Sequence, residues 1–315
     1  MDTWRGIFPA ICTPFTVDDE PDLGAQRRLV RFVLDSGAHG IVTFGLAGEV
    51  LKLSSAERMA LTDVILEETA GAVPVLVGAG GPSVASALEL ARYAERAGAN
   101  AIVLPAPLAG NIGEAALADY FVRVASSVSI PVMIQDAPAY LGVGLGLDLV
   151  RRIAASAKNV RLVKLEVGPT EMSRWIETLG DEFSVWGGNG GIYLLDCIRT
   201  GASGIIPGSD LVDLLVAIYD ADAAGDEARA DALFASVLPM LMFQMHHSID
   251  HCNACAKLVL QHRGVLDHVE LRRPAAALGA VSRELLERHL AALGLAGVEA
   301  RGPRRSNVSW DRKTG

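Results

Sequence analysis

The chain has 315 residues, of which 50% are hydrophobic and 21% charged, so it can build one large core or two modest ones and wholesale disorder is excluded. Its 28 basic residues against 37 acidic ones give a formal charge of -9, which argues against nucleic acid and anionic membranes as partners. No leader-like segment or membrane-length apolar run is present, and four cysteines suit a reducing compartment. We therefore expect a cytoplasmic protein that acts on a small molecule.

Eight short segments rich in Val and Ile predict β-strands, and each is followed by a segment of helical period. Serines precede two of these helices, at Ser54 and Ser83, and glycine follows several, which are helix start and stop signals. The predicted strands span 6–12, 40–44, 74–79, 101–105, 131–136, 160–165, 183–187 and 204–208. The predicted helices span 25–37, 54–70, 83–98, 113–128, 148–157, 170–180, 190–200 and 211–224.

Eight strand–helix units within about 220 residues are the number and length of an α/β fold of the (β/α)8 TIM barrel type. A doubly wound sheet is the alternative, but it usually has a glycine-rich phosphate motif after its first strand, where this chain reads CTPFTVDDEP. We expect the barrel at 1–224 and a C-terminal helical extension at 225–295, with helices near 226–246, 248–263 and 281–293. The polar tail, 296–315, is expected to be loose or to pack on a neighbour.

Active sites of such barrels lie at the C-terminal ends of the strands, and one lysine stands out there. Lys164 lies in VRLVKLEVG, within a strand that is expected to be enclosed on both faces. The structural interpretation is a lysine paired with Glu166 or Glu49. The functional interpretation is an amine whose charged form is disfavoured by burial, so that it attacks a ketone and forms a Schiff base. The spacing alone leaves both interpretations open.

Several motifs together resemble the dihydrodipicolinate synthase / N-acetylneuraminate lyase family, over about residues 5–295. They are GIFPAICTPF at the first strand, GLAGE after strand 2, the strand-6 lysine and the glycine-rich turn after strand 7. The resemblance implies a class I lyase without a cofactor, in which Lys164 forms an imine with pyruvate or another 2-oxo acid. It also implies a homo-oligomer, a tetramer or a dimer.

The resemblance places the substrate carboxylate at the turn after strand 2, at Leu46, Ala47 and Gly48. Family members usually have two hydroxyl residues where this chain has Leu46 and Ala47, so only backbone N–H groups are left to bind the anion. Around the substrate tail the resemblance implies Gly188 and Asn189, in GGNGG after strand 7. The Ile206 carbonyl is expected near Lys164.

Strand 5 departs from the family as well. Gln135 occupies the position of a tyrosine that relays protons to the imine, and an amide cannot exchange a proton at neutral pH. The second relay tyrosine is also missing, because the loop after strand 4 reads LPAPLAGN. Tyr140 replaces an arginine that reads the semialdehyde carboxylate in true dihydrodipicolinate synthases. The QDAP stretch resembles members that act on 2-keto-3-deoxy sugar acids, including dehydratases.

We therefore predict a Schiff-base lyase, an aldolase or a dehydratase, acting on a 2-keto-3-deoxy sugar acid. The alternatives are a 4-hydroxy-tetrahydrodipicolinate synthase, which uses pyruvate and aspartate semialdehyde, and a non-catalytic relative that binds a 2-oxo acid. Candidates for proton transfer are Glu166, which strand alternation places on the same side as Lys164, Tyr140, and a water held by Gln135. Glu166 is equally interpreted as a counter-ion of the lysine.

The segment HHSIDHCNAC offers His247, His251 and Cys255 along one helix face. Imidazole and thiolate groups at this spacing can bind zinc, but a single helix rarely supplies a full tetrahedral set. We expect packing groups here and no metal.

Overall fold

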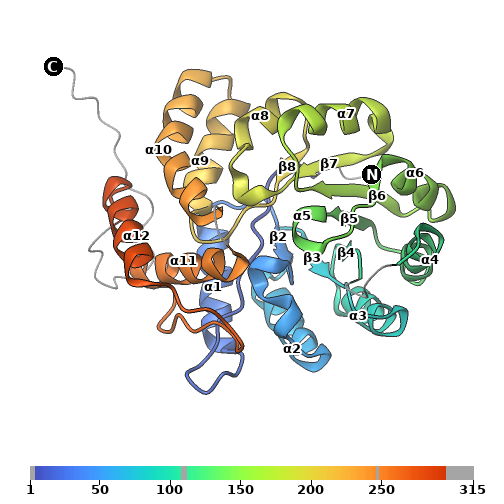
Figure 1. Cartoon of the computed structure of the whole chain (residues 1–315), viewed down its shortest axis with the longest axis horizontal. Coiled ribbons are helices and arrows are strands. Elements are labelled where there is room, and N and C mark those ends of the chain that lie inside the picture. Colours follow the sequence, from blue (N-terminus) through green and yellow to red (C-terminus); the bar gives the residue numbers. More distant parts are fainter. Residues whose placement is uncertain (1–3, 108–111, 246–247, 296–315) are drawn as a thin grey trace.

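The computed structural model describes residues 4–107, 112–245 and 248–295 and has eight parallel strands, each followed by at least one helix (Figure 1). The strands are β1 (Gly6–Ile7), β2 (Ile41–Thr43), β3 (Val75–Gly78), β4 (Ala101–Pro105), β5 (Val132–Asp136), β6 (Val160–Leu165), β7 (Ser184–Gly187) and β8 (Gly204–Ile205). Their order is β1-β8-β7-β6-β5-β4-β3-β2. Ala10 pairs in parallel with both Val42 and Gly208, which closes the sheet. The predicted (β/α)8 barrel is confirmed.

The helices surround the strands and agree closely with the predicted ranges. They are α1 (Leu23–Asp35), α2 (Ser55–Thr69), α3 (Val84–Ala97), α4 (Glu114–Ala125), α6 (Gly146–Ser156), α7 (Pro169–Leu179), α8 (Leu194–Arg199) and α9 (Val212–Ala223). Ser54 and Ser83 accept from backbone N–H groups of the first turn of α2 and α3, so both start signals are confirmed. Short elements that were not predicted include the 3-10 turn η1 (Leu46–Gly48) and α5 (Pro138–Leu141), both near strand ends.

Three helices follow the barrel: α10 (Glu227–Met245), α11 (Ile249–His262) and α12 (Ala280–Ala292). Helix α10 packs on α9, and α11 contacts η1 at the end of β2 (Figure 1). The C-terminal extension is therefore not a separate lobe, because one of its helices reaches a strand end where barrel chemistry is expected. The predicted tail, 296–315, lies outside the described residues.

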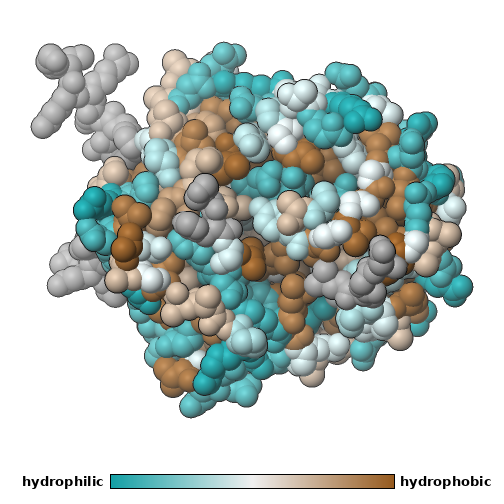
Figure 2. All heavy atoms as spheres, viewed as in Figure 1, coloured by the Kyte–Doolittle hydropathy of each residue, from teal (hydrophilic) through white to brown (hydrophobic). Residues whose placement is uncertain are grey.

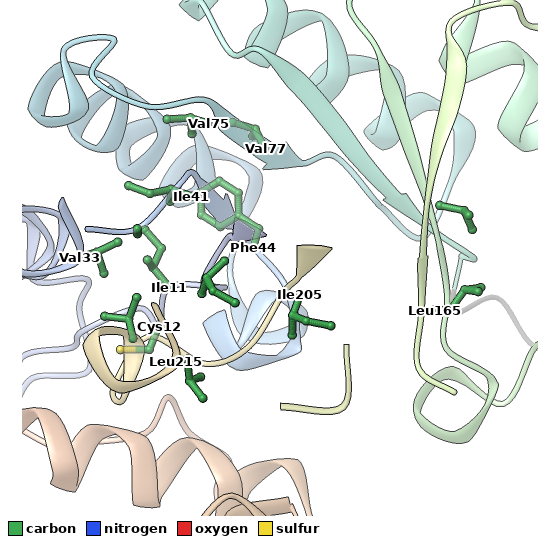
Figure 3. Close-up of a cluster of buried hydrophobic side chains, with 14 of the residues drawn as sticks. Ile11, Cys12, Val33, Ile41, Phe44, Val75, Val77, Leu165, Ile205 and Leu215 are labelled. Carbon is green, nitrogen blue, oxygen red and sulfur yellow. The ribbon is translucent and has the colours of Figure 1, made fainter. Parts of the chain in front are cut away.

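Two apolar clusters follow from the alternation of side chains along the strands. One fills the barrel interior, where the rings of Phe8 and Trp186 meet edge to face with centroids 4.6 Å apart. The other lies between strands and helices and includes Ile41, Val75 and Leu165 (Figure 3). Hydrophobic and hydrophilic side chains are interspersed over the outer face seen in Figure 2. Within the described part of the chain, no helix combines the length and the apolar character needed to span a membrane.

Candidate active site at the carboxyl ends of the strands

Lys164 lies at the mouth of the barrel and faces inward. Leu162, two residues earlier on β6, belongs to the interior cluster, so alternation gives Lys164 the same direction. Its Nζ lies 2.9 Å from Oε1 of Glu166, and the two side chains are 8% and 6% exposed. The predicted pairing of the lysine with Glu166 is confirmed. A buried ammonium is costly without a partner, and Glu166 supplies one for Lys164.

Glu166 is itself held by backbone on two sides. Its N–H donates to the Asp136 carbonyl at 3.2 Å, at the end of the neighbouring strand β5. Its carboxylate accepts a short hydrogen bond from the Asn189 N–H, in the turn after β7. The Asn189 side-chain amide donates to the Val167 carbonyl at 3.3 Å. Three strand ends, β5, β6 and β7, therefore fix the carboxylate beside the lysine.

Gln135 and Lys164 are register partners on adjacent strands. Gln135 is 5% exposed, and its side chain has no hydrogen-bond partner among the described residues. Its amide atoms are not among the described side-chain atoms that are both fully buried and without a partner, so the group keeps some contact with solvent and is available to a substrate or a water. Gln135 therefore lies beside Lys164, and its role in a reaction stays a prediction.

Tyr140 lies on α5, just beyond β5, with 38% of its surface exposed. Partial burial, together with the nearby charge of Glu166, raises the pKa of the Tyr140 phenol to about 12. The phenol is therefore neutral at physiological pH and offers a hydrogen-bond donor at the rim.

Asp136 adds a second buried carboxyl group at the end of β5. Burial raises its pKa, against the lowering effect of hydrogen bonds from the backbone N–H groups of Leu145 and Gly146. The Leu145 N–H lies 3.0 Å from Oδ1. Asp136 therefore ties the end of the rim segment that carries Tyr140 back to the strand. Sequence analysis gave Asp136, the aspartate of the QDAP stretch, no role.

The turn after β2 lies beside the interior cluster, against which Ala47 packs. The carbonyl of Gly48 accepts from the Thr13 hydroxyl at 2.8 Å, and that of Leu46 accepts from the Asn253 amide of α11 at 3.1 Å. The N–H groups of Leu46 and Ala47 donate to no described residue. The carbonyls of Leu46 and Gly48 are thus satisfied, while two donors of the turn are left for a ligand or for water.

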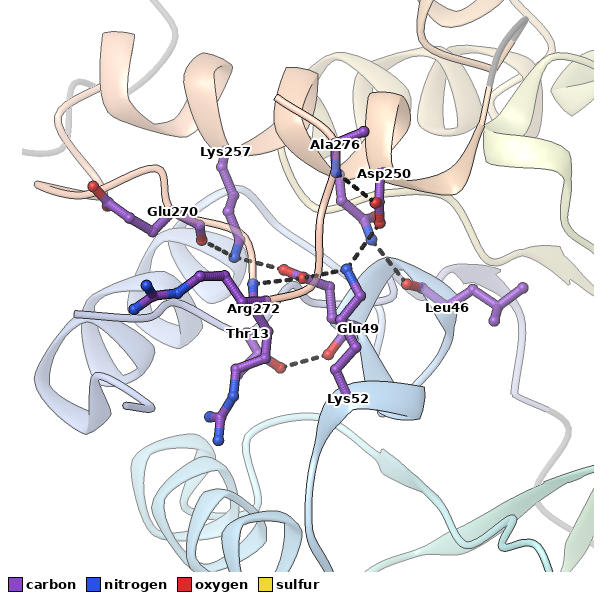
Figure 4. Close-up of polar contacts among 12 residues, drawn as sticks. Thr13, Leu46, Glu49, Lys52, Asp250, Lys257, Glu270, Arg272 and Ala276 are labelled. Atoms are coloured by element: carbon purple, nitrogen blue, oxygen red, sulfur yellow. Dashed lines mark hydrogen bonds and ion pairs between the residues drawn. The ribbon is translucent and has the colours of Figure 1, made fainter. Parts of the chain in front are cut away.

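Glu49, the second predicted partner of Lys164, pairs with another lysine. Lys257 of α11 lies 2.7 Å from Glu49 Oε1, and neither side chain is exposed (Figure 4). Sequence reasoning missed this pair. The signal was the same as for Lys164, since ACAKLVL also places one lysine in an apolar run.

The remaining predicted site residues also lie at strand ends. Ile206 follows β8, belongs to the interior cluster, and donates its N–H to the Gly187 carbonyl at 2.8 Å. Gly188 lies directly against the Glu166 carboxylate. The assignment of these groups to substrate contact stays a prediction.

The His/Cys segment packs as helix α11. His251 interacts with the Phe243 carbonyl at 3.2 Å and with Cys255 at 3.5 Å. His246 and His247 lie outside the described residues. Among the residues that the structure does describe, no group of three or more His, Cys, Asp or Glu side chains is arranged to hold a metal ion.

A closed parallel barrel with a buried lysine–glutamate pair at its C-terminal rim is an architecture common among barrel enzymes, whose active sites lie at that rim. Comparison with known proteins gives the family. The model of the Dihydrodipicolinate synthetase family matches residues 3–293, and the chain belongs to this family of lyases.

The chain is similar to several known proteins. A 4-hydroxy-tetrahydrodipicolinate synthase of Methanopyrus kandleri is 32% identical over 241 residues, 75% of this chain and 80% of the relative. An L-2-keto-3-deoxyarabonate dehydratase of Azospirillum brasilense is 31% identical over 276 residues, 86% of this chain and 88% of the relative. The structure of YagE, a prophage protein of this family from Escherichia coli K12, in complex with pyruvate, is 27% identical with a TM-score of 0.87, covering 93% of this chain and 99% of YagE.

Proposed function

We propose that this protein is a Schiff-base-forming lyase that acts on a 2-keto-3-deoxy sugar acid. The observation that carries the proposal is the buried Lys164–Glu166 pair at the barrel mouth, with a nitrogen–oxygen distance of 2.9 Å. To attack a ketone, the ammonium must first lose a proton, and the adjacent carboxylate is placed to accept it. The ion pair of Lys164 with Glu166 is therefore compatible with imine formation by the same lysine.

In the proposed reaction, the Lys164 amine adds to C2 of the 2-oxo acid, and loss of water gives a protonated imine. In a dehydratase this cation accepts the electron pair of the C3–H bond while a base takes the C3 proton, which forms an enamine. The C4 hydroxyl then leaves with a proton as water. In an aldolase no C3 proton is removed: the C4 hydroxyl of the protonated imine loses its proton, the C3–C4 electron pair moves to the imine as the aldehyde leaves, and C3 of the resulting enamine takes up a proton. Hydrolysis of the remaining imine frees Lys164.

Glu166 is the group we assign to proton transfer at the imine. It lies next to the lysine nitrogen, and a carboxylate exchanges protons readily, whereas the Gln135 amide does not. The neutral phenol of Tyr140 is a second donor, and the unpartnered amide of Gln135 can hold a water. We assign the backbone N–H groups of Leu46 and Ala47 to the substrate carboxylate.

The charges at the rim favour a polyhydroxy tail over a second carboxylate. Glu166 repels another anion near the imine, and Tyr140 offers a neutral phenol where a carboxylate would need a cation. A sugar-acid tail with hydroxyl groups can donate to Glu166 and accept from Tyr140. The relationship to the Azospirillum brasilense dehydratase supports the same substrate class.

Borohydride trapping tests the proposal. Incubation with pyruvate or a 2-keto-3-deoxy pentonate and borohydride should convert the imine into a stable secondary amine on Lys164, which peptide mass spectrometry detects. Lys257, a second buried lysine, serves as the internal control and should stay unmodified. Lys164→Met should abolish trapping, and replacement of the exposed Lys158 by methionine should not. An unmodified Lys164 with every substrate would exclude imine chemistry.

Product analysis then separates the reactions. A dehydratase releases a dehydrated oxo acid with the same number of carbons, whereas an aldolase releases pyruvate and an aldehyde. Turnover of pyruvate with aspartate semialdehyde would instead establish the synthase reaction. Binding of 2-oxo acids without trapping or turnover would identify a non-catalytic relative.

A further inference from the structure

The glycine-rich turn after β7 lies against Glu166, and one glycine is needed there for space. A Cβ built on Gly188 would overlap with the carboxyl carbon and both oxygens of Glu166. The Gly188 N–H donates to the Leu165 carbonyl at 2.9 Å, which ties the turn to the end of β6. The carboxylate thus occupies the volume that any larger residue at position 188 would need.

Asn189 completes the contact from the same turn. Its φ of 51° is left-handed, a conformation that asparagine adopts more readily than most residues. Its N–H donates to Oε2 of Glu166, while its side chain holds the Val167 carbonyl at 3.3 Å. Oε1 is the oxygen nearest Lys164. The turn therefore binds one carboxylate oxygen and leaves the other toward the lysine.

We propose that the turn at 187–191 is a device that positions Glu166, and that Gly188 and Asn189 act through this carboxylate rather than on the substrate tail. The proposal deepens the proposed function and rests on it for its catalytic consequence. An N–H donor on Oε2 fixes the rotation of the carboxylate, so that a lone pair of Oε1 stays aimed at the lysine nitrogen. An added methyl group at position 188 must push Glu166 out of this arrangement.

A double-mutant cycle tests the proposal. The variants are Gly188→Ala, Glu166→Ala and the combination of both. Gly168→Ala is the matched control, because Gly168 lies two residues beyond Glu166 and an added Cβ there meets nothing within 4 Å. Two quantities are measured for each: the rate at which borohydride traps the Lys164–pyruvate adduct, as a function of pH, and the melting temperature.

In the presence of Glu166, we expect Gly188→Ala to slow trapping by about tenfold or more, somewhat less than the roughly 10²-fold or greater contribution of a positioned acid–base group, because the carboxylate is displaced rather than removed. Its pH profile should change in the same direction as that of Glu166→Ala. In the Glu166→Ala background the same glycine replacement should slow trapping little further and lower the melting temperature much less. Gly168→Ala should trap like the wild type.

Equal losses of rate and of melting temperature in both backgrounds would overturn the proposal, since Gly188 would then act independently of Glu166. Failure of the proposed function gives a different result. If the wild type is never trapped at Lys164, imine chemistry is excluded, and the melting temperatures of the same four proteins still decide whether Gly188 and Glu166 are coupled.

Discussion

The Nζ of Lys257 lies 2.7 Å from Oε1 of Glu49, and neither side chain is exposed to solvent. Lys257 also donates to the Glu270 carbonyl at 2.6 Å, while the Arg272 N–H donates to Glu49 Oε2 at 2.9 Å (Figure 4). The pair joins α11 and the segment after it to the turn that follows β2. The C-terminal extension thereby supports the turn that contains Leu46 and Ala47, whose N–H groups we propose to bind the substrate carboxylate.

Lys257→Met should destabilise the fold by about 3–5 kcal/mol, because it leaves Glu49 buried without its closest cation. Urea unfolding followed by circular dichroism measures the change. Lys52→Met is the matched control: Lys52 is 20% exposed and lies 3.4 Å from Glu49 and 2.9 Å from Asp250. Its loss should cost about 1 kcal/mol or less. Similar costs for the two replacements would contradict a dominant role of the buried pair.

Lys164→Met should also lower the free energy of unfolding, by about 3 kcal/mol, since Glu166 keeps its Asn189 contact but loses its cation. Adding Glu166→Gln should recover most of this loss, because the amide carries no charge and can still accept from Asn189. Neither variant should form an adduct with a 2-oxo acid. If Lys164→Met alone is as stable as the wild type, the ion pair contributes little to the stability of the fold.

Asp210 should make stability depend on pH. It is 3% exposed, and burial raises its pKa above the ordinary 3.8, although the Gln244 amide donates to Oδ2 at 2.6 Å. A raised pKa means that the folded state binds the proton of Asp210 more tightly than the unfolded state does. Protonation of Asp210 therefore stabilises the fold fully below pH 3.8, and this stabilisation is lost as the pH rises through the folded pKa.

Asp210→Asn keeps an oxygen for Gln244 and removes this titration. The variant should therefore be more stable than the wild type near neutral pH, with the difference vanishing at about pH 3.5. Unfolding in urea at both pH values provides the comparison, and Asp181→Asn on the exposed surface is the control. A difference that does not change with pH would show that Asp210 is not the titrating group.

Asn253→Ala should weaken binding of 2-oxo acids, because the Leu46 carbonyl keeps the Glu49 N–H but loses the side-chain donor that anchors the turn to α11. We expect KM for the substrate to rise about tenfold with a smaller change in kcat. Asn159→Ala is the matched control, since Asn159 also bonds backbone carbonyls, of Ala125, Val128 and Ile130, but precedes β6 at the opposite end of the barrel. Equal effects of both replacements on KM would contradict a local role for Asn253.

The alternation of apolar strands with amphipathic helices determined the barrel, because both periods are local properties of the chain. The same signal located Lys164 and Glu166, since a charge within an enclosed strand is visible without coordinates. Strand β8 is shorter than predicted, Gly204–Ile205 rather than 204–208, because pairing depends on the neighbouring strands as well as on composition.

Only the tertiary structure decided which charges meet. In the sequence, Glu49 and Glu166 were equal candidates for the partner of Lys164. In the structure Glu49 pairs instead with Lys257, 208 residues away. In the sequence, Gly188 and Asn189 were recognisable only as part of a glycine-rich turn. Their contact with Glu166 is visible only in the fold. Periodicity fixes which face of an element a residue occupies, whereas the partner across the barrel depends on how strand ends from distant parts of the chain converge.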